Sequence, residues 1–388
     1  MFFKKSSLVV FCTFIGTSIF ADLQSSEPYV KIENENISTA PKSTTKQNIA
    51  WNQEEPLQYS TQESVVKTTP IERGYALPDH SLPAGYNSYG RIDTRDSYGF
   101  FLHGSFLYWF AKEKGLDVAQ FHPTDANTAT GRILQPKGEY KCGFDAGFGF
   151  NFDYDHWTLD FNYTRLHSTE SVSSGKPDNG TLIPHWLIQS SSEITHVSAK
   201  WRLALDLLDL QLSRAYYQGT HLIFIPFYGL RGGWIDQKYN AKYTLVSVVP
   251  SKHKTNSWII GPRIGTEAKW LLDAGFRFYG KGAVSLFFQR FNRNLEEMNL
   301  TTPSSIEYKV KNQQNFIQPN AELTLGLGYG TYFCNGGYHF DISAGYTFQI
   351  FWNQNMMRAL KDSYDTHIDG NAGDLVIHGL IASLRFDF

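Results

Sequence analysis

The nine residues FDAGFGFNF, at positions 144–152, decide the fold of this chain. One parity carries Phe144, Ala146, Phe148, Phe150 and Phe152, and the positions between them carry Asp, Gly, Gly and Asn. Because side chains alternate between the two faces of a β-strand, this stretch would have one aromatic face and one polar or small face. A strand with one face in lipid and the other in a polar lumen has this pattern.

The segment that follows predicts a hairpin. A short turn at 154–156 leads into WTLDFNY, residues 157–163, where Trp, Leu, Phe and Tyr again alternate with polar residues. A turn this tight joins antiparallel neighbours. The same alternation begins near Gly99 and recurs to the end of the chain at Phe388.

The whole pattern predicts about ten strands, with twelve as the alternative. Short connections are expected near 154, 217, 273 and 335, and an even number of strands leaves both ends of the domain on the same side. Alternating long loops and short turns are typical of outer-membrane barrels. The long connections are expected at 112–141, 168–192, 236–256, 290–313 and 353–374.

Two segments depart from regular alternation. Apolar residues occupy odd positions from Val197 to Leu207 and even positions from Leu208 to Leu212, which predicts a one-residue β-bulge near 206–209. The strand that begins near Leu222 is less regular, because Ile and Phe also occupy its inward positions.

The composition favours a membrane barrel over a soluble β-sandwich. Aromatic residues make up 15% of the chain and charged residues only 19%, whereas a sandwich core favours Val, Ile and Leu. A mean hydropathy of −0.34 excludes a polytopic helical membrane protein. Because lipid cannot satisfy an unpaired strand edge, the sheet must close. Trp residues occur near strand ends, as in an interfacial girdle, at Trp157, Trp234, Trp258, Trp270 and Trp352.

The first residues resemble an export signal. Lys4 and Lys5 precede an apolar stretch at 8–19, and Ala21 suits cleavage after residue 21. Residues 22–97 are rich in Ser, Thr, Gln, Asn, Glu and Pro without a period, which predicts a mostly disordered periplasmic segment or, alternatively, a partial plug. The barrel is then expected at 98–388, with its N-terminus in the periplasm of a Gram-negative-type bacterium.

Charged residues on the inward parity are the candidate functional residues. Cations are expected along three central strands, and all the anions except Glu267, which shares a strand with Arg263 and Lys269, are expected along others, so that the two signs would line different walls of the lumen. Such walls create a transverse field that orients and filters polar solutes; alternatively, the charges are internal ion pairs that fill a narrow barrel. The cations are Arg231, Arg263, Lys269, Arg277 and Lys281, and the anions are Asp145, Asp160, Glu267, Glu322 and Asp341.

No motif predicts a catalytic, cofactor or metal site. The chain has no Asp–Asp pair of the kind that omptin proteases use, and its Asp–His pairs lie in the expected periplasmic segment, at 79–80, and in a short turn, at 155–156. Cys142 and Cys334 lack metal-ligand spacing and are expected at opposite ends of the barrel, too far apart for a mutual disulfide. They are either free thiols or intermolecular cross-links to other envelope proteins. A net charge of −2 does not suggest nucleic-acid binding.

The C-terminal strand looks like an assembly signal. One face carries Leu380, Ala382, Leu384, Phe386 and the terminal Phe388. A strand of this kind is expected to be recognised by the barrel-assembly machinery.

Several motifs resemble the Legionella-type major outer membrane protein (MOMP) family, which is also found among Chlamydia relatives as MOMP-like pore-forming proteins. They cover about 98–388 and include Phe106–Trp109, the end from His378 to Phe388, and above all GLRGGWIDQKY at 229–239. The resemblance implies a pore-forming surface protein, and it supplies no catalytic site or substrate; we expect no cofactor. We therefore expect passive diffusion of small hydrophilic solutes through an outer-membrane barrel, with lipid as its surroundings and a homo-oligomer as an open alternative. The alternative function is a structural or adhesive barrel with a closed lumen, acting through its extracellular loops.

Overall fold

The computed structural model describes residues 88–95, 98–124, 131–188, 193–298, 305–366 and 372–388. The expected signal peptide at 1–21 and most of the expected flexible segment, residues 22–87, lie outside the described residues. Within these ranges, no helix has the length and apolar character needed to cross a membrane.

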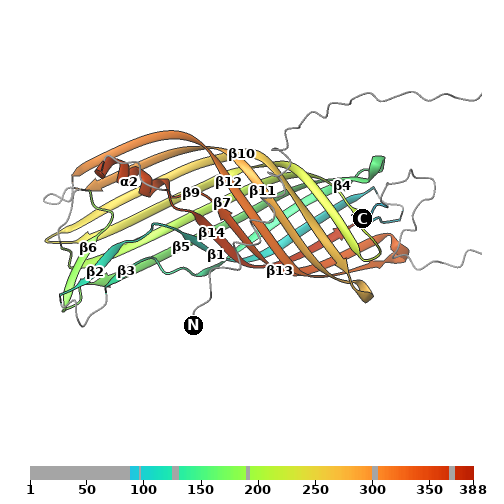
Figure 1. Cartoon of the computed structure of the whole chain (residues 1–388), viewed down its shortest axis with the longest axis horizontal. Helices are drawn as coiled ribbons and strands as arrows, with labels where there is room; N and C mark the ends of the chain where they lie inside the picture. Colours follow the sequence, from blue (N-terminus) through green and yellow to red (C-terminus); the bar gives the residue numbers. More distant parts are fainter. Residues whose placement is uncertain (1–87, 96–97, 125–130, 189–192, 299–304, 367–371) are drawn as a thin grey trace, which may run out of the picture. The chain divides into compact units, whose positions relative to one another are not determined.

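Ten long strands form one closed antiparallel barrel (Figure 1). Each long strand pairs with the next long strand along the chain, and the last pairs with the first, from Phe101 opposite Asp387 to Glu113 opposite Leu375. Closure leaves no strand edge exposed to lipid. This confirms the predicted architecture and the count of ten. The strands are β1 (Phe100–Glu113), β4 (Tyr140–Asn151), β5 (Trp157–Gly175), β7 (His196–Arg214), β9 (Leu222–Thr244), β10 (Val248–Leu271), β11 (Phe276–Met298), β12 (Ile306–Phe333), β13 (Tyr338–Phe351) and β14 (Leu375–Asp387).

The two ends of the barrel differ. At one end, which we call the short-turn end, three strand pairs are joined by single 3₁₀ turns, η2 (Tyr154–His156), η3 (Asp273–Gly275) and η4 (Cys334–Gly336). The opposite, long-loop end carries a small second sheet and a helix (Figure 1): β2 (Ala119–Pro123), β3 (Arg132–Leu134), β6 (Gly180–Pro184) and α2 (Met356–Thr366). A two-residue strand, β8 (Tyr216–Tyr217), lies beside β9 at the short-turn end.

The two faces of the barrel wall exchange their character along the strands. On β7, Leu210 points outward and is 43% exposed, whereas Leu205, nearer the long-loop end, points inward and is fully buried. The predicted bulge at 206–209 is wrong, because the pairing of β5 with β7 runs without a register shift from Trp157 opposite Arg214 to Gly175 opposite His196. The apolar residues change parity because the environment of each face changes, while the backbone stays regular.

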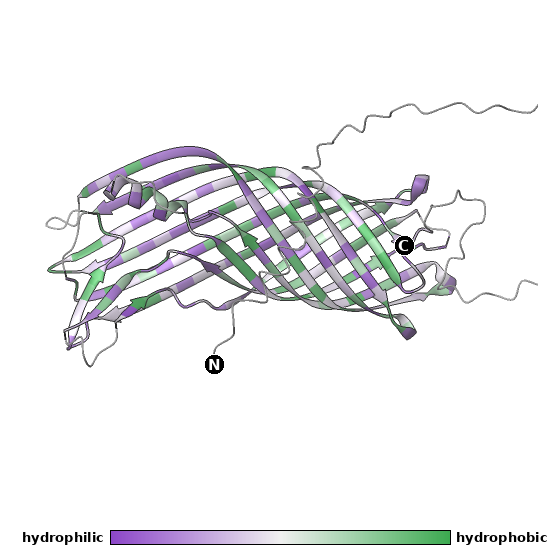
Figure 2. Cartoon of the chain, in the orientation of Figure 1, coloured by the Kyte–Doolittle hydropathy of each residue, from purple (hydrophilic) through white to green (hydrophobic). Residues whose placement is uncertain are grey.

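The expected long connections at 236–256 and 290–313 are also mostly strand. β9 continues to Thr244 and β10 begins at Val248, while β11 ends at Met298 and β12 begins at Ile306. In these extensions most outward positions are polar and the inward positions are mainly apolar, aromatic or small, which is the reverse of the lipid-facing pattern. The alternation of hydropathy along the strands is visible in Figure 2.

Outward apolar residues define the level of the membrane. On β10 they extend from Trp258 to Trp270. At the usual rise and tilt of a barrel strand this stretch covers about 28 Å along the axis, close to the roughly 25 Å apolar band of outer-membrane barrels. We call this stretch the apolar band, and the strands continue well beyond it toward the long-loop end.

Beyond the apolar band the lumen is filled by a hydrophobic core. Trp186, from the connection after β6, is fully buried beside Tyr239 and His253, at ring-centroid distances of 4.4 and 4.6 Å. Its indole N–H donates to the Asp117 carbonyl at 2.8 Å, and the Tyr243 hydroxyl donates to the Val118 carbonyl at 2.9 Å. The small sheet and the 182–188 segment therefore close the barrel at its long-loop end.

Residues 88–95 lie across the short-turn end. The Gly90 amide donates to the Ala215 carbonyl at 2.9 Å, and the Arg95 amide donates to the Gly336 carbonyl at 2.7 Å. Ala215 follows β7 and Gly336 precedes β13. In the closed strand order β7 and β13 lie on opposite sides of the barrel. The described end of the expected periplasmic segment thus crosses the mouth of the barrel.

Candidate functional site: the polar lumen

A polar cavity of about 320 Å³ occupies the lumen within the apolar band. Its walls come from all ten barrel strands and from Gly90, Arg91 and Ile92 at the short-turn end. The structure places all ten predicted lumen charges on its lining: Asp145, Asp160, Arg231, Arg263, Glu267, Lys269, Arg277, Lys281, Glu322 and Asp341.

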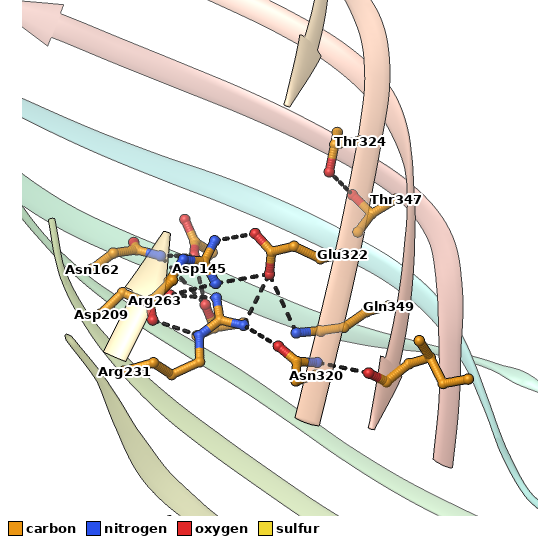
Figure 3. Close-up of polar contacts among 12 residues, drawn as sticks. Asp145, Asn162, Asp209, Arg231, Arg263, Asn320, Glu322, Thr324, Thr347 and Gln349 are labelled. Carbon is orange, nitrogen blue, oxygen red and sulfur yellow. Dashed lines mark hydrogen bonds and ion pairs between the residues drawn. The ribbon is translucent and has the colours of Figure 1, made fainter. Parts of the chain in front are cut away.

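Four of the charged side chains in the lumen form a central cluster (Figure 3). Arg231 from β9 donates to both carboxylate oxygens of Asp209 on β7, at 2.5 and 2.7 Å. It also reaches Glu322 on β12, through Nη1 to Oε2 at 2.9 Å. Arg263 from β10 bonds the same Glu322 carboxylate through both of its terminal nitrogens, and its Nη1 lies 3.9 Å from Asp209. The two arginines and two carboxylates thus bridge the lumen from β7, β9 and β10 to β12.

Amide side chains complete this cluster. Asn320 accepts from Arg231 at 3.2 Å and donates to the Ile350 carbonyl at 2.9 Å, while Gln349 donates to Glu322 at 3.4 Å. All four charged members are largely buried, with side-chain exposures of 2–13%. Buried charges of this kind persist only when each is paired and hydrogen-bonded.

The remaining charges form smaller groups. Arg277 pairs with Asp341 at 2.5 Å, and Lys269 lies 3.4 Å from Glu267. Asp160 bonds His103 at 2.8 Å. The Asp145 carboxylate accepts from Ser105 at 3.2 Å and Thr164 at 2.8 Å, as well as from Asn162.

Lys281 differs from the other predicted cations. Among the described residues it has no ion pair within 4 Å, and its ammonium lies 5.2 Å from the centre of the Phe227 ring. Arg263 approaches the same ring at 5.6 Å. Phe227 lies on β9 and is one of the residues that make the alternation of that strand irregular in the sequence. Its ring provides a cation-binding aromatic face inside the lumen.

The sequence predicts separate walls of opposite charge, but in the structure side chains from the two walls contact each other across the lumen. Cations and anions do come from the expected strands, but Arg231 and Arg263 reach Glu322 across the lumen. The interior therefore combines ion pairs with a cavity that both signs of charge line.

Several residues of the site do not follow from the sequence pattern as interpreted above. Asp209 falls in the predicted bulge, so its pairing with Arg231 is unexpected. Arg385 is not singled out on the C-terminal strand, yet its guanidinium lies 3.7 Å from the centre of the Phe101 ring and bonds Asp387. His103 lies on the inward face of β1 and lines the cavity, but it is not among the predicted lumen residues. Simple counting of inward positions in regular strands would find Asp209, Arg385 and His103.

One titratable contact at the long-loop end involves the 182–188 segment. At the end of β11, beyond the apolar band, the Glu297 carboxyl accepts the Ile188 N–H at 3.2 Å. Burial raises the pKa of Glu297 to about 8. This side chain is 2% exposed and anchors the closing segment.

Cys142 and Cys334 are free and exposed, and no group of His, Cys, Asp and Glu in the described part of the chain is arranged to hold a metal ion. Cys334 lies in η4 at the short-turn end, and Cys142 lies on β4 opposite Tyr108.

The predicted assembly residues are on the closing strand. β14 pairs with both β1 and β13, and the Phe388 amide donates to the Phe100 carbonyl at 3.0 Å. The rings of Phe388 and Phe100 are 4.9 Å apart. Leu380 and Leu384 point outward and are 56% and 50% exposed, and Ala382 shares their parity.

A closed antiparallel barrel with an apolar outer band and a polar, charged lumen defines an integral outer-membrane protein. The chain belongs to the family described as the Legionella pneumophila major outer membrane protein precursor, whose model matches residues 95–388. This confirms the family resemblance seen in the sequence motifs.

The barrel also has distant likenesses among solved structures. It is similar to a Pseudomonas aeruginosa FadL homologue, at 7% identity and a TM-score of 0.25, over 74% of this chain and 89% of that one. It is similar to the P. putida toluene transporter TodX at 7% identity and a TM-score of 0.20, with the same coverage. No curated protein matches the chain closely enough to count as a relative.

Proposed function

We propose that this outer-membrane barrel is a porin-like protein that admits small hydrophilic solutes by passive diffusion. The observation that carries the proposal is the 320 Å³ cavity within the apolar band, lined by charged side chains of both signs. Charged groups that line a pore screen solutes by size and charge, and they need no cofactor. We place the short-turn end, with the N-terminus, in the periplasm and the long-loop end outside the cell.

In this proposal the described state is the closed one. Trp186, Leu187 and Ile188 are buried in the hydrophobic core at the long-loop end. A solute that enters from the short-turn end meets this core, so conduction requires the 182–188 segment to move. The proposed channel is therefore gated at its long-loop end.

The second candidate is a structural or adhesive surface barrel with a permanently closed lumen. The hydrophobic core favours it, because a packed apolar interior excludes water and hydrated solutes. In that case the long-loop end would act as a rigid platform, and the central ion cluster would only hold the strands together.

Single-channel recording in planar bilayers distinguishes the two. We compare the wild type with Trp186→Ala, which removes the largest side chain of the closing segment, and with Trp234→Ala as a control, because Trp234 is outward-facing and 53% exposed. The porin proposal predicts discrete steps for the wild type, longer open times for Trp186→Ala and no change in gating for Trp234→Ala. If folded, heat-modifiable wild type and Trp186→Ala both give only background current, the closed-barrel function stands instead.

A further inference from the structure

The outer surface just beyond the apolar band carries a cluster of basic side chains on three adjacent strands. All of them point outward, and we call them the basic face: Lys200 and Arg202 on β7, Lys238 and Lys242 on β9, and Lys252 and Lys254 on β10. None of these six has an ion pair within 4 Å to any described residue.

The strand register aligns three of these charges in a row. Arg202 lies directly opposite Lys238, and Lys238 lies directly opposite Lys254. Like charges at directly opposed positions of antiparallel strands destabilise a sheet. A regular barrel wall gains nothing in stability from this row, which therefore suggests an anionic partner from outside the chain.

The nearby acids do not neutralise the face. Glu296 is opposite Lys252 in the register, but it pairs with Lys309 on β12 at 3.1 Å. Asp236 is opposite Ala204 and Asn256, one outward position closer to the apolar band than Lys238. Asp206, lower on β7, is bonded by Tyr163 at 2.7 Å and by His167 at 3.3 Å.

The height of the face identifies the kind of partner. Trp234 and Trp258 mark the edge of the apolar band nearest the long-loop end. Lys238 lies four residues after Trp234 on β9, and Lys254 lies four residues before Trp258 on β10, so both are farther toward the long-loop end. Four residues of a tilted barrel strand rise about 10 Å along the axis. The row of charges therefore lies at the level of lipid headgroups rather than at the loop tips.

We propose that the basic face binds the phosphate groups of a phosphorylated glycolipid in the outer leaflet. Lysine and arginine side chains near an anionic leaflet each contribute favourably to lipid binding, and their N–H groups form charge-assisted hydrogen bonds to phosphate oxygens. The proposal rests on the orientation of the proposed function, with the long-loop end outside the cell, but it does not depend on whether the lumen conducts.

The test uses the full-length folded protein in neutral detergent micelles, titrated with bis-phosphorylated lipid A. The test variant is Arg202→Gln/Lys238→Gln/Lys254→Gln, which removes the row. The control variant is Lys112→Gln/Lys141→Gln/Lys176→Gln, which loses the same charge on β1, β4 and the connection after β5. Heat-modifiability of each variant reports that the barrel is folded.

We expect the row variant to bind lipid A about two orders of magnitude more weakly than the wild type, and the control variant to bind like the wild type. Dephosphorylated lipid A should bind the wild type as weakly as lipid A binds the row variant. Millimolar inorganic phosphate should not compete, because a single free phosphate cannot engage a row that spans three strands.

Three results would overturn the proposal: equal affinity of the row and control variants, equal affinity for the dephosphorylated lipid, or full competition by inorganic phosphate. The last comparison titrates the wild type with a soluble sulfated polysaccharide. Tighter binding of that polymer than of lipid A would assign the face to a soluble polyanion and refute the lipid. Conductance is measured separately, so failure of lipid binding leaves the porin proposal unaffected.

Discussion

Trp234 on β9 and Trp258 on β10 lie directly opposite each other and both point outward. On the short-turn side of this pair, the outward residues of the two strands are mainly apolar, and the inward ones include Arg231 and Arg263. On the long-loop side, the next outward residues are Asp236 and Asn256, and buried aromatic residues face inward. The pair thus marks the level at which the environment outside the barrel changes from lipid to headgroups and water.

The exchange of faces makes a prediction for two leucines of one strand. Leu205→Ala should destabilise the protein by about 2–5 kcal/mol, because it leaves a cavity in a packed core. Leu210→Ala should cost much less, because lipid chains can fill the space left on the outer surface. Urea unfolding in phospholipid vesicles measures both. Equal losses would show that Leu205 is not in a close-packed interior.

The central ion cluster makes a second prediction. Arg231→Ala leaves the buried carboxylates of Asp209 and Glu322 without their shared donor, and should cost about 3–5 kcal/mol of unfolding free energy. Arg165→Ala is the control, because the Arg165 side chain is about half exposed and its contact with Asp206 is long, at 3.7 Å. This substitution should cost at most about 1 kcal/mol of unfolding free energy. Similar urea midpoints for the two variants would contradict the role assigned to the cluster.

Period-two alternation is enough to predict the closed barrel, its ten strands and the charged lining of the lumen. It fails where the same period has the opposite meaning. Between Val197 and Leu207 the apolar parity faces a core, whereas from Leu208 to Leu212 it faces lipid, and a single sequence does not mark which solvent each face meets. Because the sequence does not show which environment each face meets, it wrongly predicts the bulge at 206–209 and connections that are too long at 236–256 and 290–313. For the same reason it misses Asp209 as a lumen residue.

The closing of the lumen is harder to predict, because it depends on contacts between distant segments. Trp186 lies in a connection that looks like a surface loop in the sequence, yet its ring packs against those of Tyr239 and His253 inside the barrel. The partners of Arg231 likewise come from β7 and β12, 22 and 91 residues away. Side-chain spacing within one strand carries no information about such pairs.

The raised pKa of Glu297 predicts how stability depends on pH. Its ordinary value is 4.5, and burial raises the pKa to about 8 in the folded protein. Between these values the folded carboxyl holds a proton that the unfolded chain has lost, so the contribution of Glu297 to stability falls as pH rises from about 4.5 to 8 and levels off above. Limited proteolysis of the 182–188 segment at pH 5 and pH 8.5 should show faster cleavage at the higher pH. Glu297→Gln should reduce this difference, and an undiminished pH effect in that variant would assign it to another group.

The position of Cys334 tests the orientation of the barrel. It lies in η4 at the short-turn end, which we place in the periplasm. In a Cys142→Ser variant, a membrane-impermeant maleimide should therefore label the mature protein only after the outer membrane is permeabilised. The Cys334→Ser variant controls for labelling at Cys142. Labelling of Cys142→Ser in intact cells would place the short-turn end outside and reverse the topology. Non-reducing gels of native membranes test the cross-linking alternative, because a disulfide to another envelope protein would give high-mass species that vanish with reductant.

The terminal phenylalanine should matter for assembly more than for the finished barrel. Phe388 contacts Phe100 and Phe386, with ring centroids 4.9 and 5.6 Å apart, and lies where β14 closes against β1. Phe388→Ala should lower the amount of heat-modifiable barrel in cell membranes, while the protein that does fold should keep its unfolding free energy within about 1 kcal/mol and its conductance. Phe278→Ala is the matched control, because it also removes an outward phenylalanine, 55% exposed, but from β11, which is not the C-terminal strand. If both variants reach the membrane in equal amounts, the last residue has no special part in assembly. If Phe388→Ala instead folds normally in vitro but accumulates unassembled in cells, recognition of the C-terminal strand matters more for assembly than the contact between Phe388 and Phe100.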